Sequence, residues 1–387
     1  MIKKSAELAE IVERAKKAGR AAIDTEFVWE RTYFPQLGLI QIGLSEEENF
    51  LIDAPAIDDL SPIGQLLEDE SVVKILHDAQ QDLYILRRAT GAYPKNIFDT
   101  RLAGGFARLS STISLMDLLK EVVGVSLPKT ESRTDWLRRP LSDRQVAYAI
   151  DDVRYMPRVM DELIKRVDDA GRSEWLAEEL SVYDDPALYE EKDPRTQYGR
   201  LKGVSRMGGD ELSVLRELAA WREEEARRHD RPRGHILKDD IVVTLAKRRP
   251  GSKEEMQYIK AISDRDVRCY GRAVVQAIKK GLETGGEDIS LPPSRNGVDE
   301  ILSTRIDLAL AYLKGKCLSS GLDMGLLTTR AEVTALLAEG PQSDAKSHRL
   351  LRGWRRIFAG DELLQVMAGE YAIRLDRNTG LPQLVSD

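Results

Sequence analysis

Two pairs of side chains in this 387-residue sequence have the types and spacings that suit metal-assisted chemistry. The first pair, Asp24 and Glu26, lies two residues apart in the apolar run AAIDTEFV, which predicts a strand over residues 21–28. Side chains alternate along a strand, so both carboxylates leave the same face. Buried neighbouring carboxylates repel each other and lose solvation, and a divalent cation with oxygen ligands offsets both costs. The alternative is an edge strand whose acids face water.

The second pair, Tyr148 and Asp152, lies within an amphipathic stretch that predicts helix over residues 142–167. A spacing of four places both side chains on one helical face, whereas Asp151 is rotated by about 100°. A phenol beside a metal-binding carboxylate could orient a water or help to deprotonate it. The alternative is an ordinary interface tyrosine next to a solvated aspartate.

A third candidate acid, Asp82, lies in HDAQQDLYILRR, where a strand over residues 72–77 gives way to a helix. A carboxylate in the first turns of a helix is also favoured by the helix dipole, so capping is the alternative role. Asp78 fits the same description, and the local pattern does not choose between the two.

The elements that must position these residues are short apolar runs separated by helical patterns. The predicted strands cover residues 21–28, 37–44, 49–54 and 72–77, and the first three suit a meander. From about residue 101 the pattern is helical. The expected architecture is an α/β domain, with a mixed sheet flanked by helices.

Composition limits the class of protein. Hydrophobic residues make up 42% and charged residues 32%, as in a folded chain of two or three domains. No apolar run approaches the roughly 18 residues of a membrane helix, and residues 1–20 lack a signal-peptide core. Two cysteines and four histidines leave little for disulfides or zinc, so we expect a reducing, cytoplasmic location. The net charge of −7 argues against nucleic-acid binding by bulk charge but allows a local basic track.

Read in order, DTEF at 24–27, QDL at 81–83 and YxxxD at 148–152 resemble the three motifs of the DEDD exonuclease superfamily, tyrosine subclass. The longer stretches DTEFVWERTYFPQLGLIQ (24–41) and SRTDWLRRPLSDRQVAYAIDDV (132–153) resemble the ribonuclease D family more closely still. One departure is the Gln that precedes the DL dipeptide, where the family commonly has an acid; this position neighbours a ligand and is not one.

This resemblance implies a ribonuclease H-like fold and hydrolysis by two divalent metal ions, Mg²⁺ or Mn²⁺. It favours Asp82 over Asp78 as the third acid. Tyr148 matches the residue that positions the attacking water. The four acids that match the metal-binding and catalytic positions are Asp24, Glu26, Asp82 and Asp152.

Four further residues are candidates for contact with the substrate. Tyr33 and Phe34 offer aromatic surfaces on which unpaired bases could stack, with core packing as the alternative. Arg133 and Arg138 are candidates for phosphate contacts, with an ordinary solvated surface charge as the alternative.

The helical second half of the chain suggests further domains. Residues 211–250 resemble the HRDC module, with Leu212, Leu215, Leu218 and Trp221 on one stripe. A basic set in it could bind RNA phosphates: Arg227, Arg228, Arg231, Arg233 and Lys238. The expected boundaries are an exonuclease domain at 1–183, a linker at 184–208, an HRDC domain at 209–288 and a divergent second HRDC-like all-α domain at 289–387.

The function that the resemblance implies is a metal-dependent 3′–5′ exoribonuclease that releases 5′-mononucleotides. Its expected substrates are single-stranded 3′ ends of RNA, above all of tRNA precursors and other stable RNAs. We expect no membrane association and no obligate protein partner. The alternatives are a 3′–5′ exonuclease for single-stranded DNA, which would use the same four acids, and a non-catalytic RNA-binding protein.

Overall fold

The computed structural model describes residues 1–128, 134–285, 299–340 and 343–386, and the chain forms two compact units. The first unit comprises residues 1–27, 37–189 and 298–387, and the second comprises residues 28–36 and 190–297. Each unit is described by itself below.

The first unit is built on a five-stranded mixed sheet of order β3-β2-β1-β4-β5. Its strands are β1 (Arg20–Val28), β2 (Gln36–Gly43), β3 (Asn49–Ile52), β4 (Val73–Leu76) and β5 (Ile97–Asp99). Strands β2 and β3 pair antiparallel, whereas β4 pairs parallel with both β1 and β5. The mixed sheet is confirmed, and β5 is an addition, because three residues are too few to give a periodic signal.

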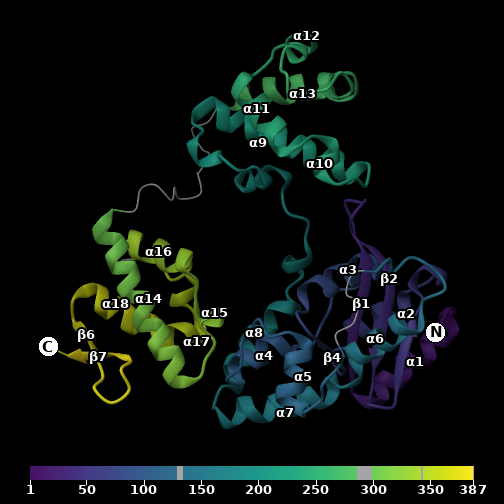
Figure 1. Cartoon of the computed structure of the whole chain (residues 1–387), viewed down its shortest axis with the longest axis vertical. Helices are drawn as coiled ribbons and strands as arrows, with labels where there is room; N and C mark the ends of the chain where they lie inside the picture. Colours follow the sequence, from purple (N-terminus) through teal and green to yellow (C-terminus); the bar gives the residue numbers. More distant parts are fainter. Residues whose placement is uncertain (129–133, 286–298, 341–342, 387) are drawn as a thin grey trace. The chain divides into compact units, whose positions relative to one another are not determined.

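Helices cover both faces of this sheet (Figure 1). One face packs against α1 (Ser5–Ala18), α2 (Ser61–Glu68) and α3 (Gln80–Thr90) through a shared apolar core. The other face packs against α4 (Thr100–Phe106), α5 (Leu115–Val123), α6 (Asp143–Arg154) and α7 (Met156–Asp169). Along β1 the alternation is visible in the cores: Ala21 and Ile23 join the first, and Ala22 joins the second.

The helix that carries Tyr148 and Asp152 is shorter than expected. The single helix predicted over 142–167 is two helices, α6 and α7, because the chain breaks at Tyr155 and Pro157 lies in the first turn of α7. A capping box between Ser142 and Gln145 fixes the start of α6. Gly43 lets α6 lie directly on β2, since a Cβ there would stand 2.7 Å from the Val153 carbonyl oxygen.

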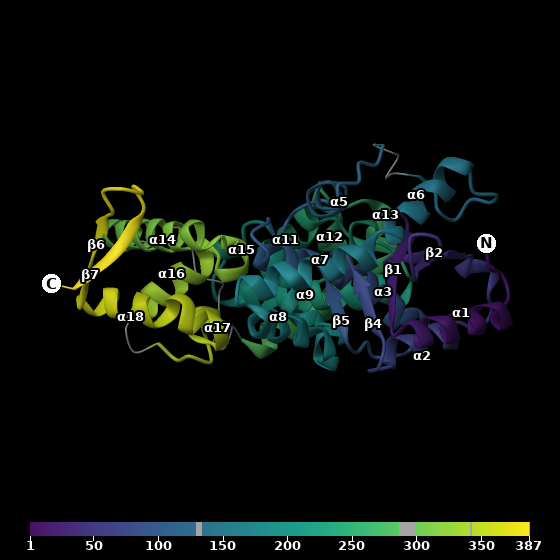
Figure 2. The same ribbon diagram turned by 90° about the horizontal axis from the view of Figure 1, so that it is seen from below.

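The C-terminal block is helical but ends in a β-hairpin, which corrects the expectation of an all-helical tail. Its elements are α14 (Glu300–Ser320), α15 (Met324–Leu327), α16 (Arg330–Glu339), α17 (Gly353–Arg355), α18 (Asp361–Ala368), β6 (Tyr371–Leu375) and β7 (Pro382–Ser386). Asp376 accepts hydrogen bonds from the backbone of Asn378 and Thr379 in the turn, where Gly380 has φ +68°. Such turn chemistry is a hairpin signal. The hairpin lies beside α14 and α18 (Figures 1 and 2).

This C-terminal block shares one apolar core with the five-stranded sheet. The buried Trp354 ring stacks on Trp175 of α8 (Ser173–Leu180) at 5.2 Å and meets Phe106 edge-on at 5.3 Å. Arg172 joins the two parts by donating to the carbonyls of Phe106 (2.7 Å) and Gly321 (3.1 Å). The block is therefore a built-in part of the first unit.

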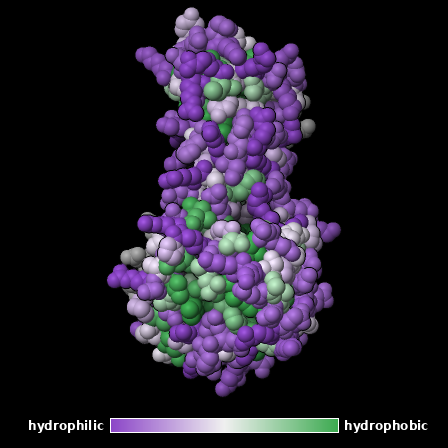
Figure 3. Space-filling model, turned by 90° about the vertical axis from the view of Figure 1, so that its right-hand side faces the viewer, coloured by the Kyte–Doolittle hydropathy of each residue, from purple (hydrophilic) through white to green (hydrophobic). Residues whose placement is uncertain are grey.

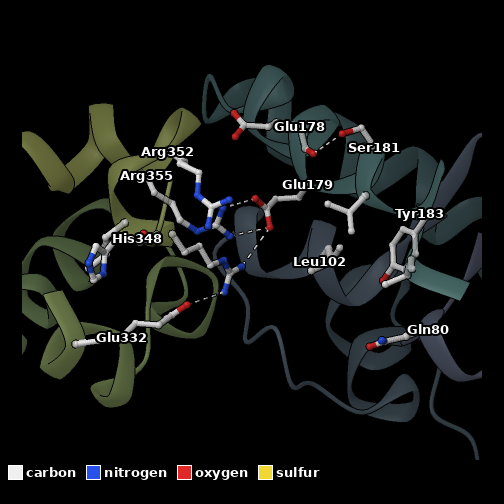
Figure 4. Close-up of a pocket in the computed structure, with 16 residues that line it drawn as sticks. Gln80, Leu102, Glu178, Glu179, Ser181, Tyr183, Glu332, His348, Arg352 and Arg355 are labelled. Carbon is white, nitrogen blue, oxygen red and sulfur yellow. Dashed lines mark hydrogen bonds and ion pairs between the residues drawn. The ribbon is translucent and has the colours of Figure 1, made fainter. Parts of the chain in front are cut away.

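A cavity of about 880 Å³, lined by both charged and apolar side chains, lies along this seam (Figure 4). On one of its walls Glu179 accepts a hydrogen bond from Arg355 Nη2 at 2.7 Å and from the Trp354 indole at 2.9 Å. Arg349 approaches the same carboxylate at 3.3 Å. These charged side chains are therefore mainly engaged in the contacts between α8 and the C-terminal block.

The second unit is a helical bundle with its own core. Its helices are α9 (Gly209–Arg228), α10 (Arg233–Ile236), α11 (Asp239–Arg248), α12 (Lys253–Gln257) and α13 (Asp264–Thr284). The predicted leucine stripe of α9 is buried in that core. Gly281 permits the closest contact between α13 and α9, since a Cβ there would stand 2.5 Å from the Val214 Cα.

The segment predicted as a linker, 184–208, has local structure. It contains the short 3₁₀ turns η3 (Pro186–Tyr189), η4 (Pro194–Arg200) and η5 (Val204–Arg206). Tyr189 is buried in the core of the first unit, and Leu201 is buried in the core of the second. The segment therefore contributes to both cores.

One face of the molecule is mostly hydrophilic, with a group of apolar side chains over its lower part (Figure 3). The hydrophilic character of this face is in keeping with the high charged fraction of the chain. Among the residues that the structure describes, no helix is both long enough and apolar enough to cross a bilayer.

Replacing Trp354 by alanine tests the shared core. We expect Trp354→Ala to lower the free energy of unfolding of the first unit by about 3–5 kcal/mol, because a buried ring is lost between two aromatic neighbours. Ile357→Ala is the matched control, since Ile357 is 76% exposed in the next turn. Urea titration followed by circular dichroism measures both variants. Equal stability of the two variants would show that the C-terminal block does not share the core.

Candidate active site

Three of the predicted acids meet on one side of the sheet. Asp24 and Glu26 leave the same face of β1, and Asp152 comes from the last turn of α6. One carboxylate oxygen from each lies within 4.8 Å of the other two. Strand alternation and the close contact between β2 and α6 bring these side chains together from positions more than 120 residues apart.

The fourth acid, Asp82, joins them from the first turn of α3, where it is buried. The Thr25 hydroxyl donates a hydrogen bond to its carboxylate. Asp78, which the sequence pattern could not separate from Asp82, is different: it has φ +66° and an exposed side chain that pairs with Arg101. Only Asp82 of the two faces the acids of β1.

Burial and mutual repulsion raise the pKa values of all four carboxyl groups. Burial raises the pKa of Glu26 to about 8, with Asp152 and Asp82 adding to the effect. Burial likewise raises the pKa of Asp152 to about 7 and that of Asp82 to about 6. Burial and then the neighbouring carboxylates hold the pKa of Asp24 well above its usual range. The site therefore gathers acidic groups, and among the described residues no basic side chain pairs with them.

Tyr148 completes the cluster from the turn of α6 before Asp152. Burial and the nearby carboxylates raise the pKa of its phenol, and a hydrogen bond with Asp152 adds to this effect. The Tyr148 ring lies 6.1 Å from that of Trp136, which is 2% exposed. Tyr148 is thus held as a neutral hydroxyl that can donate a hydrogen bond at neutral pH.

The donor set fits a hard divalent cation. All the donors are carboxylate oxygens, which Mg²⁺ and similar ions prefer over nitrogen and sulfur ligands. Asp152 Oδ2 is buried and has no hydrogen-bond partner among the described residues, so this carboxylate keeps one acceptor oxygen without a donor. Bound positive charge would also offset the repulsion that raises these pKa values.

The four predicted substrate contacts remain predictions. Tyr33 and Phe34 belong to the second unit, where Asp230 accepts hydrogen bonds from both backbone N–H groups (3.0 and 2.9 Å). The Tyr33 hydroxyl contacts Glu223 of α9 and accepts from Arg227 at 3.2 Å. Arg138 is exposed in the loop before α6. Arg133 lies outside the described residues, and these four contacts remain predictions.

Sequence reasoning missed Thr25, which alternation assigns to the opposite face from Asp24. Its hydroxyl reaches Asp82 because β1 runs to Val28 while its neighbour β4 ends at Leu76, where the chain turns into α3. In the sequence, Trp136 stands out only as a member of the stretch 132–153 that resembles the family. A hydrophobic pattern gives no signal for the contact of Thr25 with Asp82 or of Trp136 with Tyr148, since both depend on how separate elements meet in space.

Two family profiles match the chain. The profile described as 3′–5′ exonuclease matches residues 1–168, and the HRDC domain profile matches residues 211–278. The exonuclease match covers β1, α3 and α6, which carry the four acids and Tyr148. An exonuclease domain of this kind implies a site for a divalent metal.

Full-length relatives extend the match. Ribonuclease D of Desulfotalea psychrophila is 42% identical over 93% of this chain and 96% of its own length. Ribonuclease D of Pseudomonas paraeruginosa is 35% identical over 95% of this chain and 96% of its own length. The crystal structure of Escherichia coli RNase D, described as an exoribonuclease involved in structured RNA processing, superposes with TM-score 0.82 at 27% identity, covering 95% of this chain and 98% of that one. The chain belongs to the ribonuclease D family of 3′–5′ exoribonucleases.

Proposed function

We propose that Asp24, Glu26, Asp82 and Asp152 bind two divalent ions, Mg²⁺ or Mn²⁺, and that this site removes 5′-mononucleotides from the 3′ end of RNA. The observation that carries the proposal is the half-buried, oxygen-only cluster of acids from β1 and α6, with Asp82 of α3 close enough to raise the pKa values of Asp24 and Glu26. When bound, such ions activate the attacking water and stabilise the leaving 3′ oxygen. The proposed substrates are single-stranded 3′ ends, those of tRNA precursors above all.

The protein's own residues have two tasks in this scheme. The four carboxylates would hold the ions, which would supply positive charge to the scissile phosphate. Tyr148, whose pKa is raised, keeps its proton and orients the attacking water by a hydrogen bond. Thr25 holds the Asp82 carboxylate through its hydroxyl. No nucleophilic side chain is needed for this chemistry.

The neighbouring acids Asp82 and Asp78 provide a matched pair for the activity test. We expect Asp82→Asn, like Asp24→Asn, to lower the rate of 3′-end shortening by more than about 100-fold, because a metal ligand is lost. Asp78→Asn is the control and should retain most activity, because asparagine tolerates the positive φ at this position. Electrophoresis of 5′-labelled single-stranded RNA with Mg²⁺, Mn²⁺ or EDTA follows the products.

The same assay with DNA of equal sequence separates the alternatives. We expect RNA to be shortened faster than DNA, and neither to be shortened in EDTA. Faster cleavage of DNA would favour the DNA exonuclease, and intact RNA under all conditions would favour a non-catalytic RNA-binding protein. Activity that survives Asp24→Asn would contradict the assignment of the acids.

The raised pKa values predict how metal binding depends on pH. In the folded, metal-free protein Glu26 and Asp152 stay protonated up to about pH 8 and about pH 7, respectively. In the unfolded chain the same groups lose their protons near pH 4.5 and pH 3.8. Their stabilising contribution is therefore complete below about pH 4 and is lost as pH rises through the folded pKa values. Cation binding requires the ionised carboxylates and releases protons.

We therefore expect Mg²⁺ to raise the melting temperature more at about pH 8 than at about pH 6, where protons compete for the site. Differential scanning fluorimetry with MgCl₂, and with KCl at equal ionic strength as the control, measures this difference. A gain in melting temperature that is the same at both pH values would show that the acids do not take up the cation.

We further propose that the second unit contributes to RNA capture through a basic groove of about 920 Å³. Arg200, Lys202 and Lys238 line it and are exposed. Other cations of the predicted basic set are paired with acids: Arg227 lies 3.0 Å from Glu191, and Arg228 contacts Glu225. The groove, more than the basic set as a whole, therefore offers charge to phosphates.

Replacing Lys202 and Lys238 together by glutamine tests this groove. We expect weaker binding of a tRNA with a 3′ trailer, and a slope of log affinity against log salt smaller by about 2. The rate at which a short, unstructured oligonucleotide is shortened should stay unchanged. Lys279→Gln on the exposed face of α13 serves as the control. Filter binding at several salt concentrations gives the slope, and an unchanged slope would remove the groove from the proposal.

A further inference from the structure

One fully buried polar side chain beside the acids has no role in the scheme above. Gln41 lies in the middle of β2 and is 0% exposed. Neither its amide nitrogen nor its amide oxygen has a hydrogen-bond partner among the described residues. An unpaired buried amide is costly, since each polar atom loses its hydration without compensation. Such a residue in a packed core calls for an explanation.

The sheet places Gln41 on the face that carries the acids. Ile40 and Ile42 join the core with α1, together with Ile23 of the neighbouring strand β1. By alternation, Gln41 faces the opposite side, which is also the side of Asp24 and Glu26. Neighbouring strands lie about 4.8 Å apart, so the amide and these carboxylates belong to one layer of side chains.

Helix α6 covers this same face at close range. Gly43, two residues beyond Gln41 and on the same face, approaches the Val153 carbonyl so closely that a Cβ would stand 2.7 Å from its oxygen. The residue before Val153 is Asp152. Its Oδ2 is a second buried atom without a partner among the described residues. One unpaired donor and one unpaired acceptor thus occupy the same layer between β2 and α6.

We propose that Gln41 is a positioning residue for the metal site: its amide N–H group holds the Asp152 carboxylate through one buried water, so that the other carboxylate oxygen is left for the metal. This inference rests on the metal-dependent mechanism proposed above. Hydrogen bonds from surrounding groups to metal-binding carboxylates fix their orientation, and their loss typically weakens metal affinity about 10- to 100-fold. A buried water can both donate and accept hydrogen bonds, so a bridge through it holds the carboxylate nearly as well as a direct hydrogen bond does.

Gln41→Met tests the role, because methionine has nearly the same shape and lacks the amide. We expect the Mg²⁺ concentration for half-maximal activity to rise about 10-fold or more. The KM for RNA at saturating Mg²⁺ should stay near that of the wild type, because the amide touches no substrate. Without metal, the melting temperature should be equal to or higher than that of the wild type, because two unpaired polar atoms leave the core.

Leu39→Met is the matched control, since Leu39 is also fully buried and lies two residues earlier on the same strand. It should leave the Mg²⁺ requirement unchanged. Gln41→Asn keeps an amide on a shorter side chain and should recover part of the affinity. Binding is measured independently of activity by the rise in melting temperature across an Mg²⁺ titration of the full-length chain.

The outcomes are distinct. A weaker Mg²⁺ response in Gln41→Met, with Leu39→Met unchanged, supports the proposal. Equal responses in the two variants, or a marked loss of metal-free stability in Gln41→Met alone, would overturn it and make Gln41 a packing residue. A wild-type protein that does not respond to Mg²⁺ would instead refute the metal-dependent mechanism, and this inference with it.

Discussion

The repulsion among four clustered, poorly solvated carboxylates is the constraint on which the rest of this structure depends. The fold gathers Asp24, Glu26, Asp82 and Asp152 where burial raises their pKa values, and no basic side chain in the described part of the chain pairs with them. Desolvation and like charge both oppose this arrangement. The packing of the sheet and its helices must therefore offset the unfavourable free energy of the clustered carboxylates. Functional sites in other proteins commonly carry such a cost, which the rest of the fold offsets.

Several features of the fold follow from that demand. Gly43 lets α6 approach β2 closely enough for Asp152 to reach the acids of β1. The capping box at Ser142 fixes where α6 begins, and the break at Tyr155 fixes where it ends. On the far side of the core, the C-terminal block adds Trp354 and the Glu179–Arg355 pair to the support of the same unit. The block thus contributes to stability whatever its part in RNA binding.

Much of this could be predicted from the sequence, because strand alternation and helical spacing determine which side chains share a face. They placed Asp24 with Glu26, and Tyr148 with Asp152, but left each pair open to a structural explanation. Asp82 could be chosen over Asp78 only by family resemblance, since their difference lies in a positive φ and a pairing with Arg101. The contact of Thr25 with Asp82, the break at Tyr155 and the C-terminal hairpin depend on where elements end, which periodicity determines poorly.

The central claim is that the four acids form one site for two divalent ions. Anomalous scattering from crystals of the full-length protein soaked in Mn²⁺ with a 3′-terminal nucleotide tests it most directly. We expect two anomalous peaks about 3.5–4 Å apart, between the carboxylates of Asp24, Glu26, Asp82 and Asp152. A single peak would contradict the two-ion site, and the absence of any peak at these carboxylates would contradict the assignment of the metal site itself.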